Sequence, residues 1–289
     1  MLGYEVSVLL ALVVLVTYSI GDTLAKRIVE AYHYPKSAAL VTGISMIPFI
    51  AAFFVLPPQP IKSYSVALAA VAGIFYGLGF IFLYKSLSTE QTTNTMALSE
   101  FFKATLVLFG VFVFANHLTI VQSSSIALIF VGALLIIMTE KLRVNKKLLY
   151  ALVGFIFWAV LWVTMQVSIN SSQSWLPEGL IASALAFVVS FAWSLAGGSP
   201  RMRHKSDTRQ RANWSSIVVG IAVGVGSLIF CYLLFAKFLA VGSAIIALSP
   251  VIVAVASRKL YLDKLIPIQL TGLVIMVLAA LALSLASYI

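Results

Sequence analysis

The strongest constraint on the fold is a succession of apolar runs, each long enough to cross a lipid bilayer as a helix. A hydrocarbon core about 30 Å thick requires about 20 apolar residues in α-helical form. The chain contains ten such runs, separated by short polar or proline-containing segments. The predicted spans are Val6–Ile28, Ser37–Leu56, Tyr64–Tyr84, Thr93–Phe114, Val121–Thr139, Leu148–Ile169, Leu176–Ala196, Trp214–Ala236, Val241–Ser257 and Leu265–Ile289. The sequence therefore predicts an all-α integral membrane protein with ten transmembrane helices.

The composition excludes an ordinary soluble domain. Of the 289 residues, 62% are hydrophobic and 10% are charged, whereas soluble domains are nearer half apolar and a quarter charged. A formal net charge of +10 can indicate nucleic-acid binding, but here the basic residues lie between apolar runs of spanning length. We therefore expect the lipid bilayer, and no nucleic acid, among the partners of this chain.

The chain also repeats itself. Three short segments of the first half recur in the same order in the second half, at spacings of 147, 150 and 147 residues. The pairs are Gly73–Gly79 with Gly220–Gly226, Ala97–Ser99 with Ala247–Ser249, and Leu118–Gln122 with Leu265–Gln269. This pattern predicts a first five-helix repeat in residues 1–140, a cytoplasmic linker at 141–147 and a second five-helix repeat in residues 148–289.

The distribution of Lys and Arg predicts the orientation in the membrane. Leaving aside Lys26 and Lys103, which are expected within helices, fifteen basic residues follow the odd-numbered spans and only Lys62 and Lys237 follow the even-numbered ones. By the positive-inside rule, the basic loops are cytoplasmic and both termini lie outside the cell membrane. Because five is an odd number, the two halves must insert in opposite directions, which makes them inverted repeats, a typical transporter arrangement.

These repeated segments resemble those of the EamA-type, ten-helix branch of the drug/metabolite transporter superfamily. The shared features are a glycine-rich third helix, the Ala-Leu-Ser segment, a Leu-x-x-x-Gln start of each last helix, and Pro250 after Ser249. The family commonly pairs an aromatic residue with a lysine eight positions later, as Tyr18 and Lys26 do here. Three features depart from the family. Asn116 and Asp263 stand where it often has glutamate, Glu100 stands at the counterpart of Pro250, and many members are thought to have both termini inside.

The resemblance implies a central cavity bordered by the first, third, fourth, sixth, eighth and ninth spans. Charged groups are costly in a bilayer and therefore mark candidate sites there. Asp22 and Lys26 lie four residues apart on the first span, and Glu100 and Lys103 lie three apart on the fourth. The alternatives are that the first pair lies at the cytoplasmic helix end, and that the second pair is an ion pair that only holds helices together.

Aromatic and amide side chains complete the predicted binding site. The candidates are those at matching or periodic positions: Tyr18 on the first span, Tyr76 and Phe80 on the third, and Trp158, Trp162 and Gln166 on the sixth. Stripes of this kind also serve as helix packing, which stays the alternative for each of them. The sequence shows no catalytic constellation, no metal-ligand cluster and no cofactor motif, so we expect neither an enzyme nor a cofactor.

The predicted function is transport of a small organic metabolite by alternating access. Two acids, two bases and several aromatic rings fit an amino-acid-like, aromatic or zwitterionic solute, with proton coupling and efflux both left open. One alternative is an exchanger of anionic or nucleotide-linked solutes, in which Lys26 and Lys103 bind the anion. Another, of a different class, is a lipid-handling protein. A monomer is expected to suffice because both repeats lie in one chain.

The charge distribution makes a first testable prediction about topology. In intact cells, single-cysteine variants are treated with a thiol reagent that does not cross the membrane. A Ser206→Cys variant should stay unlabelled and a cysteine placed near Lys62 should react, because the basic loops are expected in the cytoplasm. The opposite labelling pattern would show that the orientation is inverted.

Overall fold

The computed structural model describes residues 4–57, 59–98, 102, 119–137, 145–197, 206–236, 245–246, 248–263 and 265–285. Throughout this part of the chain the regular secondary structure is helical. Its helices are α1 (Tyr4–Tyr32), α2 (Tyr34–Val55), α3 (Ser63–Leu87), α4 (Thr92–Ala97), α6 (Ile120–Ile137), α7 (Leu149–Ser172), α8 (Leu176–Ala196), α9 (Ser206–Phe235), α11 (Ser249–Tyr261) and α12 (Pro267–Leu285). The prediction of an all-α fold is confirmed.

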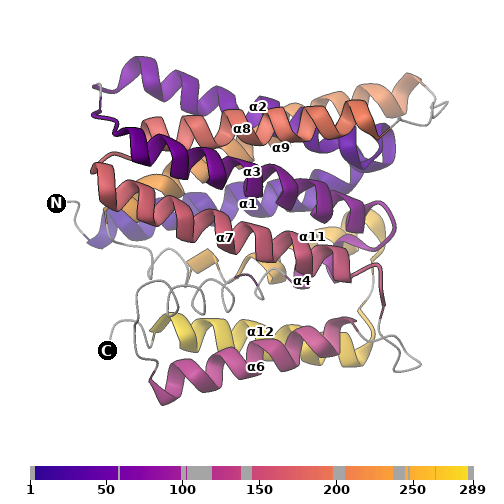
Figure 1. Ribbon diagram of the computed structural model, residues 1–289. Coiled ribbons are helices and arrows are strands. Elements are labelled where there is room, and N and C mark those ends of the chain that lie inside the picture. Colours follow the sequence, from indigo (N-terminus) through magenta and orange to yellow (C-terminus); the bar gives the residue numbers. More distant parts are fainter. Residues whose placement is uncertain are drawn as a thin grey trace.

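Six of the described helices are long and apolar enough to span a membrane: α1, α2, α3, α7, α8 and most of α9. Two shorter apolar helices, Ile120–Ile136 and Pro267–Ala282, fall within α6 and α12. The first residues of α1 and the last of α12 lie at the same end of the bundle (Figure 1). An even number of membrane crossings would place them in this way.

Three helices differ from their predicted spans by more than two helical turns. α9 begins eight residues before Trp214, because the polar segment ahead of that residue continues the helix instead of forming a loop. α4 and α11 cover only parts of the fourth and ninth predicted spans, and the remainder of the fourth lies mostly outside the described residues. The division at residues 140 and 147 stays a prediction.

Local chemistry explains where several helices begin. Pro35, Pro177 and Pro250 stand in the first turns of α2, α8 and α11, where the missing backbone N–H of proline has no helical partner to lose. A single residue, His33, joins α1 to α2 and has a φ of 65°. This left-handed conformation turns the chain sharply between two long helices, both of which pack against α9.

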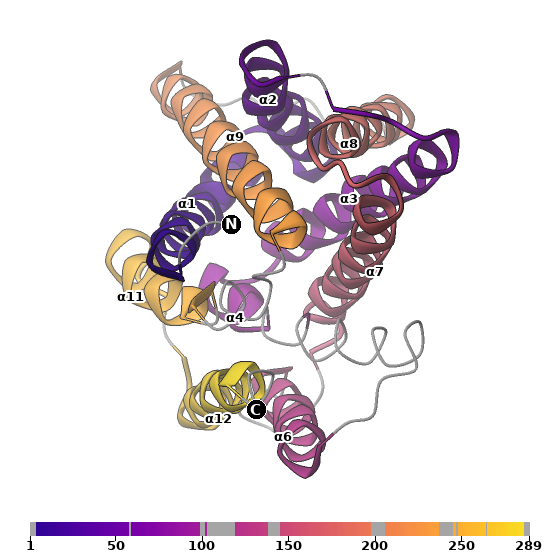
Figure 2. The same cartoon turned by 90° about the vertical axis from the view of Figure 1, so that its left-hand side faces the viewer.

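Helices of the two halves interlock instead of forming separate bundles. From the first half, α3 packs against α7 and α8, and from the second half, α9 packs against α1 and α2 (Figure 2). The partners correspond, since α3 and α9 carry the repeated glycine segment. As a result, both glycine-bearing helices lie in the middle of the assembly, next to the cavity described below.

Glycine makes these crossings close. A Cβ placed on Gly77 would lie 2.8 Å from the carbonyl oxygen of Ala186 on α8. A Cβ on the matching Gly224 would overlap the carbonyl oxygen of Ser45 on α2 and lie 2.9 Å from Cγ of Pro48. Matching positions of the two halves thus make matching backbone contacts, as small residues do at helix interfaces in membranes.

The helices α6 and α12 form a pair at one edge of the molecule (Figure 1). A Cβ on Gly132 would lie 2.7 Å from the carbonyl oxygen of Gly272, and the same distance separates the reverse pair. The amide of Gln269 also donates a hydrogen bond of 3.1 Å to the carbonyl oxygen of Ile136. The glutamine of the Leu-x-x-x-Gln segment therefore ties the last helices of the two halves together.

The glycine contacts predict that the two crossings are equally sensitive to one added methyl group. Gly77→Ala and Gly224→Ala should each lower the free energy of unfolding by about 1–3 kcal/mol, the usual cost of overpacking. Gly197→Ala is the control, since Gly197 is exposed at the end of α8 with a φ of −79°. A Cβ there would meet the carbonyl oxygen of Trp193 in the last turn of α8, at 3.1 Å, and Cγ of Pro35, at 3.7 Å, without overlapping either. Thermal unfolding in detergent measures all three, and unchanged stability of Gly77→Ala and Gly224→Ala would contradict the packing described.

Candidate functional site

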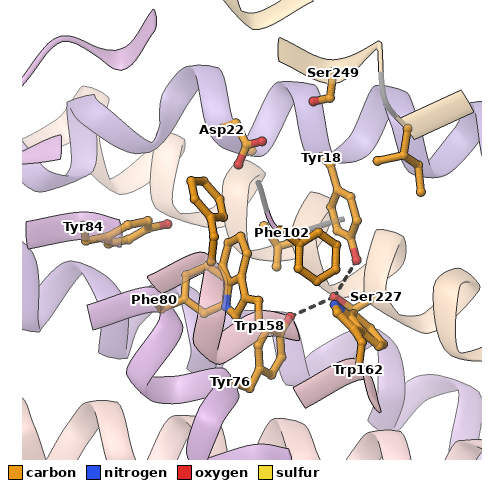
Figure 3. Close-up of a pocket in the computed structure, with 14 residues that line it drawn as sticks. Tyr18, Asp22, Tyr76, Phe80, Tyr84, Phe102, Trp158, Trp162, Ser227 and Ser249 are labelled. Atoms are coloured by element: carbon orange, nitrogen blue, oxygen red, sulfur yellow. Dashed lines mark hydrogen bonds between the residues drawn. The ribbon is translucent and has the colours of Figure 1, made fainter. Parts of the chain in front are cut away.

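A cavity of about 90 Å³ lies between helices of both halves. α1, α3, α7 and α9 form most of its wall, and Phe102, Ile246 and the start of α11 complete it (Figure 3). Its lining is mainly aromatic, and its polar groups are two serines, one carboxylate, the tyrosine hydroxyls and the indole N–H groups of Trp158 and Trp162. The lining residues are Tyr18, Gly21, Asp22, Tyr76, Phe80, Tyr84, Phe102, Phe155, Trp158, Trp162, Val223, Ser227, Ile246 and Ser249.

A serine on α9 holds two tyrosines at one side of the cavity. The hydroxyl oxygen of Ser227 lies 2.8 Å from that of Tyr76 and 3.2 Å from that of Tyr18. Figure 3 shows both tyrosines converging on this serine. Because Ser227 comes from the second half and both tyrosines from the first, this hydrogen-bonded cluster links the two halves at the cavity wall.

The one carboxylate in the described lining is that of Asp22. The side chain is half-buried, and among the described residues it makes no hydrogen bond or ion pair. A carboxylate near the middle of a membrane helix carries a large desolvation cost unless a cation, a proton or water compensates it. Asp22 is therefore the group in this wall that a cationic ligand would most favourably contact.

Aromatic rings pack edge to face around the rest of the wall. The ring centroids of Phe80 and Trp158 are 5.2 Å apart with an interplanar angle of 72°, and those of Phe155 and Trp158 are 5.7 Å apart at 69°. Such contacts fix the ring orientations. The result is a rigid aromatic surface that suits a flat apolar ligand.

The structure brings six of the ten predicted site residues together in this cavity: Tyr18, Asp22, Tyr76, Phe80, Trp158 and Trp162. Two others, Lys26 and Gln166, are described but do not line it. The remaining two, Glu100 and Lys103, lie outside the described residues. The binding roles of all ten residues stay predictions.

Lys26 is engaged elsewhere. Its ammonium group donates a hydrogen bond of 3.0 Å to the carbonyl oxygen of Glu90 and lies 6.0 Å from the ring centroid of Tyr261. It follows Asp22 by one helical turn toward the end of α1, so its long side chain reaches the polar segment after α3. Gln166 likewise donates to Asn170 on its own helix, at 2.9 Å.

Other lining residues were not among the sequence candidates, although several carried a signal. Tyr84 completes the i, i+4, i+8 stripe of Tyr76 and Phe80, and Phe155 stands one turn before Trp158. Ser227 directly follows the repeated glycine segment, and Ser249 belongs to the repeated Ala-Leu-Ser segment. The repeated segments therefore indicated these two serines, which are neither charged nor aromatic.

Within the part of the chain that the structure describes, no group of three or more His, Cys, Asp or Glu side chains could hold a metal ion. In the described lining, the groups that could contact an organic solute are the carboxylate, the hydroxyls, the indole N–H groups and the aromatic rings. These groups can hold an organic solute by charge, hydrogen bonding and burial.

Residues 6–138 match the model of the EamA-like transporter family. This segment of the chain belongs to that family. The match confirms the resemblance noted in the sequence, and it contains the α1 and α3 residues of the cavity wall. Together with the six apolar helices, it identifies a multi-pass membrane transporter of the drug/metabolite type.

Solved structures share the fold of this chain. One of them, described only as the crystal structure of a protein, has a TM-score of 0.69 and 14% sequence identity to this chain. The similarity covers 99% of both chains, so it includes the second half, which the EamA family match does not reach. No curated protein sequence matches the chain significantly.

The hydrogen-bonded cluster of this EamA-like transporter makes a testable prediction. Ser227→Ala should lower the free energy of unfolding by about 1–3 kcal/mol, because it leaves two buried tyrosine hydroxyls without their partner. Adding Tyr18→Phe and Tyr76→Phe to Ser227→Ala should recover most of that loss, because the orphaned hydroxyls are then removed. Thermal unfolding of the variants in detergent measures both changes.

The matched control is Ser190→Ala, since Ser190 is fully buried on α8 and its hydroxyl has no hydrogen-bond partner. That variant should be neutral or slightly stabilised. If Ser227→Ala behaves like Ser190→Ala, the cluster does not contribute to stability as described.

Proposed function

We propose that this protein carries small organic solutes with a flat apolar body and a positively charged amine head across the cell membrane. Amino-acid-like zwitterions fall within this class. The observation that carries the proposal is the Asp22 carboxylate, which faces an aromatic cavity and has no protein cation beside it among the described residues. The central cavity between the two halves is the proposed binding site.

Each part of such a solute has a counterpart in the cavity wall. The amine would pair with Asp22, and the flat body would lie against the rings of Phe80, Trp158 and Trp162. Aromatic faces also attract organic cations directly, an effect that grows when both partners are desolvated. A concave, mostly apolar site with a few placed polar groups is the usual form of a small-molecule site.

The same carboxylate supports an exchange mechanism. A carboxyl group in a low-dielectric cavity is neutralised by a bound proton or by a bound cation, and it cannot hold both at once. Solute binding at Asp22 would thus displace a proton, and proton binding would displace the solute. This competition would couple the movement of one to the countermovement of the other.

Alternating access is supported by the arrangement of the halves. The matching contacts of Gly77 and Gly224 are those expected of two inverted repeats, which can rock about a fixed central site. The cavity of about 90 Å³ is smaller than the roughly 300–1,000 Å³ of typical small-molecule sites. An aromatic solute would therefore need the halves to move apart before it could enter.

Exchange of an anionic solute is the alternative that the described wall favours least. Such a solute would need a cationic group in the cavity, and Lys26 is bound to the Glu90 carbonyl instead. Lys103, the other candidate for this role, lies outside the described residues.

A series of solutes with one ring and different head charges tests the proposal. Uptake of phenylethylamine, phenylalanine and phenylpropionate into proteoliposomes is compared at equal pH inside and outside, after subtracting leakage into protein-free vesicles. The cation and the zwitterion should be transported and the anion should not. Asp22→Asn should lower transport of phenylethylamine at least about tenfold, because the amine loses its buried charge partner.

Glu5→Gln is the control, because Glu5 is an exposed acid in the first turn of the same helix. It should leave transport of all three solutes at the wild-type level. Transport of phenylpropionate as fast as phenylethylamine, or wild-type kinetics for Asp22→Asn, would refute the proposed role of the carboxylate.

A further inference from the structure

Two glycines at matching positions of the repeat support two aromatic side chains of the cavity wall. A Cβ placed on Gly79 of α3 would overlap the Cδ1 and Nε1 atoms of Trp158 on α7. A Cβ on Gly226 of α9 would lie 2.7 Å from Cε1 and 2.9 Å from Cδ1 of Tyr18 on α1. In both halves, the ring lies directly on the bare backbone of the glycine.

These contacts differ from those of the other glycines in the same repeated segments. Cβ atoms on Gly73 and Gly77 would meet backbone and Cβ atoms of α8, so these glycines allow two helices to approach. Gly79 instead meets the side chain of Trp158, and Gly226 meets that of Tyr18, both of which line the cavity; Gly226 also meets Oγ1 of Thr17, at 2.8 Å, which does not. The third glycine of each segment therefore contributes to the shape of the cavity.

A displaced Trp158 ring would have to move toward the cavity. Separating α3 from α7 at this level would give up a close backbone contact, since a Cβ on Gly154 of α7 would lie 3.0 Å from the carbonyl oxygen of Gly79. Phe80 and Phe155 flank the indole, with centroids 5.2 and 5.7 Å away. The free volume beside the ring is the cavity of about 90 Å³, so a small displacement removes much of it.

A methyl group on Gly226 would similarly displace Tyr18, the ring that lies on this glycine. Tyr18 is held by its hydrogen bond to Ser227, the residue after Gly226. A methyl group on Gly226 would push the Tyr18 ring off α9 while its hydroxyl is still bound to the same helix. The ring would then tilt into the cavity or lose the hydrogen bond.

We propose that Gly79 and Gly226 determine the largest ring system that the cavity accepts, by letting Trp158 and Tyr18 lie flat against α3 and α9. They act as positioning residues through those two aromatic side chains. The proposal extends the proposed function, because it specifies which of the amine-bearing solutes can be carried. It predicts that single methyl groups at these positions select against bicyclic solutes.

The first experiment measures cavity size without relying on any transported solute. A Ser249→Cys reporter in a Cys231→Ala background is treated with methyl and benzyl methanethiosulfonate, and the ratio of the two reaction rates is recorded. Gly79→Ala should lower the benzyl-to-methyl ratio about tenfold, as one extra carbon in a tight pocket commonly does. Gly226→Ala should change it in the same direction.

The control is Gly132→Ala, because a Cβ on Gly132 of α6 would overlap Cγ of Met276 on α12, and neither residue lines the central cavity. It imposes a similar clash elsewhere and should leave the ratio within about twofold of the parent value. Combining Gly79→Ala with Trp158→Phe should restore the ratio, because the smaller ring no longer meets the new methyl group. Loss of stability alone would not produce this rescue.

The second experiment compares transport of tryptamine with that of phenylethylamine, two primary amines that differ in ring size. Gly79→Ala should reduce tryptamine transport more than phenylethylamine transport, again with rescue by Trp158→Phe. If the wild-type protein carries neither amine, the proposed function fails, whereas the labelling ratio still decides the role of the glycines. A labelling ratio unchanged by Gly79→Ala, or changed equally by Gly132→Ala, overturns the inference.

Discussion

The architecture depends on the close approach of helix backbones at the glycines of α3 and α9. In a bilayer there is no hydrophobic driving force between helices, so contact area at close range must hold them together. Gly77 and Gly224 supply that contact across the boundary between the halves, α3 with α8 and α9 with α2. The crossing places both helices at the centre of the molecule, where their next turns form part of the cavity wall.

This arrangement explains how a carboxylate can be retained inside an apolar protein. Asp22 faces a space between the halves, and no cation of the described residues lines that space, so water, a proton or a solute can compensate the carboxylate. The aromatic rings around it give up little hydrogen bonding when water leaves, which favours replacement of water by a flat solute. Binding of the solute and countermovement of the proton would then both depend on the Asp22 carboxylate.

The sequence predicted the helices from their apolar length. It also predicted Asp22 and most of the aromatic residues of the cavity wall, because a charge in an apolar span and rings at regular spacing are visible in the sequence. Tyr18 and Trp158 occupy comparable positions on the first spans of the two halves, 140 residues apart, and they lie on the matching glycines Gly226 and Gly79. The sequence did not predict where the Lys26 side chain lies, because a long side chain one turn from Asp22 can reach either the cavity or the helix end. The sequence also did not predict Ser227 as a site residue, because the role of a small hydroxyl becomes visible only with its two tyrosine partners in place.

The central claim is that Asp22 binds a solute cation in competition with a proton. The most direct measurement is the affinity of the purified protein for benzyltrimethylammonium, whose charge does not change with pH, across a range of pH. In the acid range, where the carboxyl group is protonated, the apparent Kd should rise about tenfold for each unit by which the pH falls, because one proton competes with one cation. Asp22→Asn should bind weakly with no such dependence. A flat profile for the wild-type protein, or the same profile in Asp22→Asn, would contradict the account.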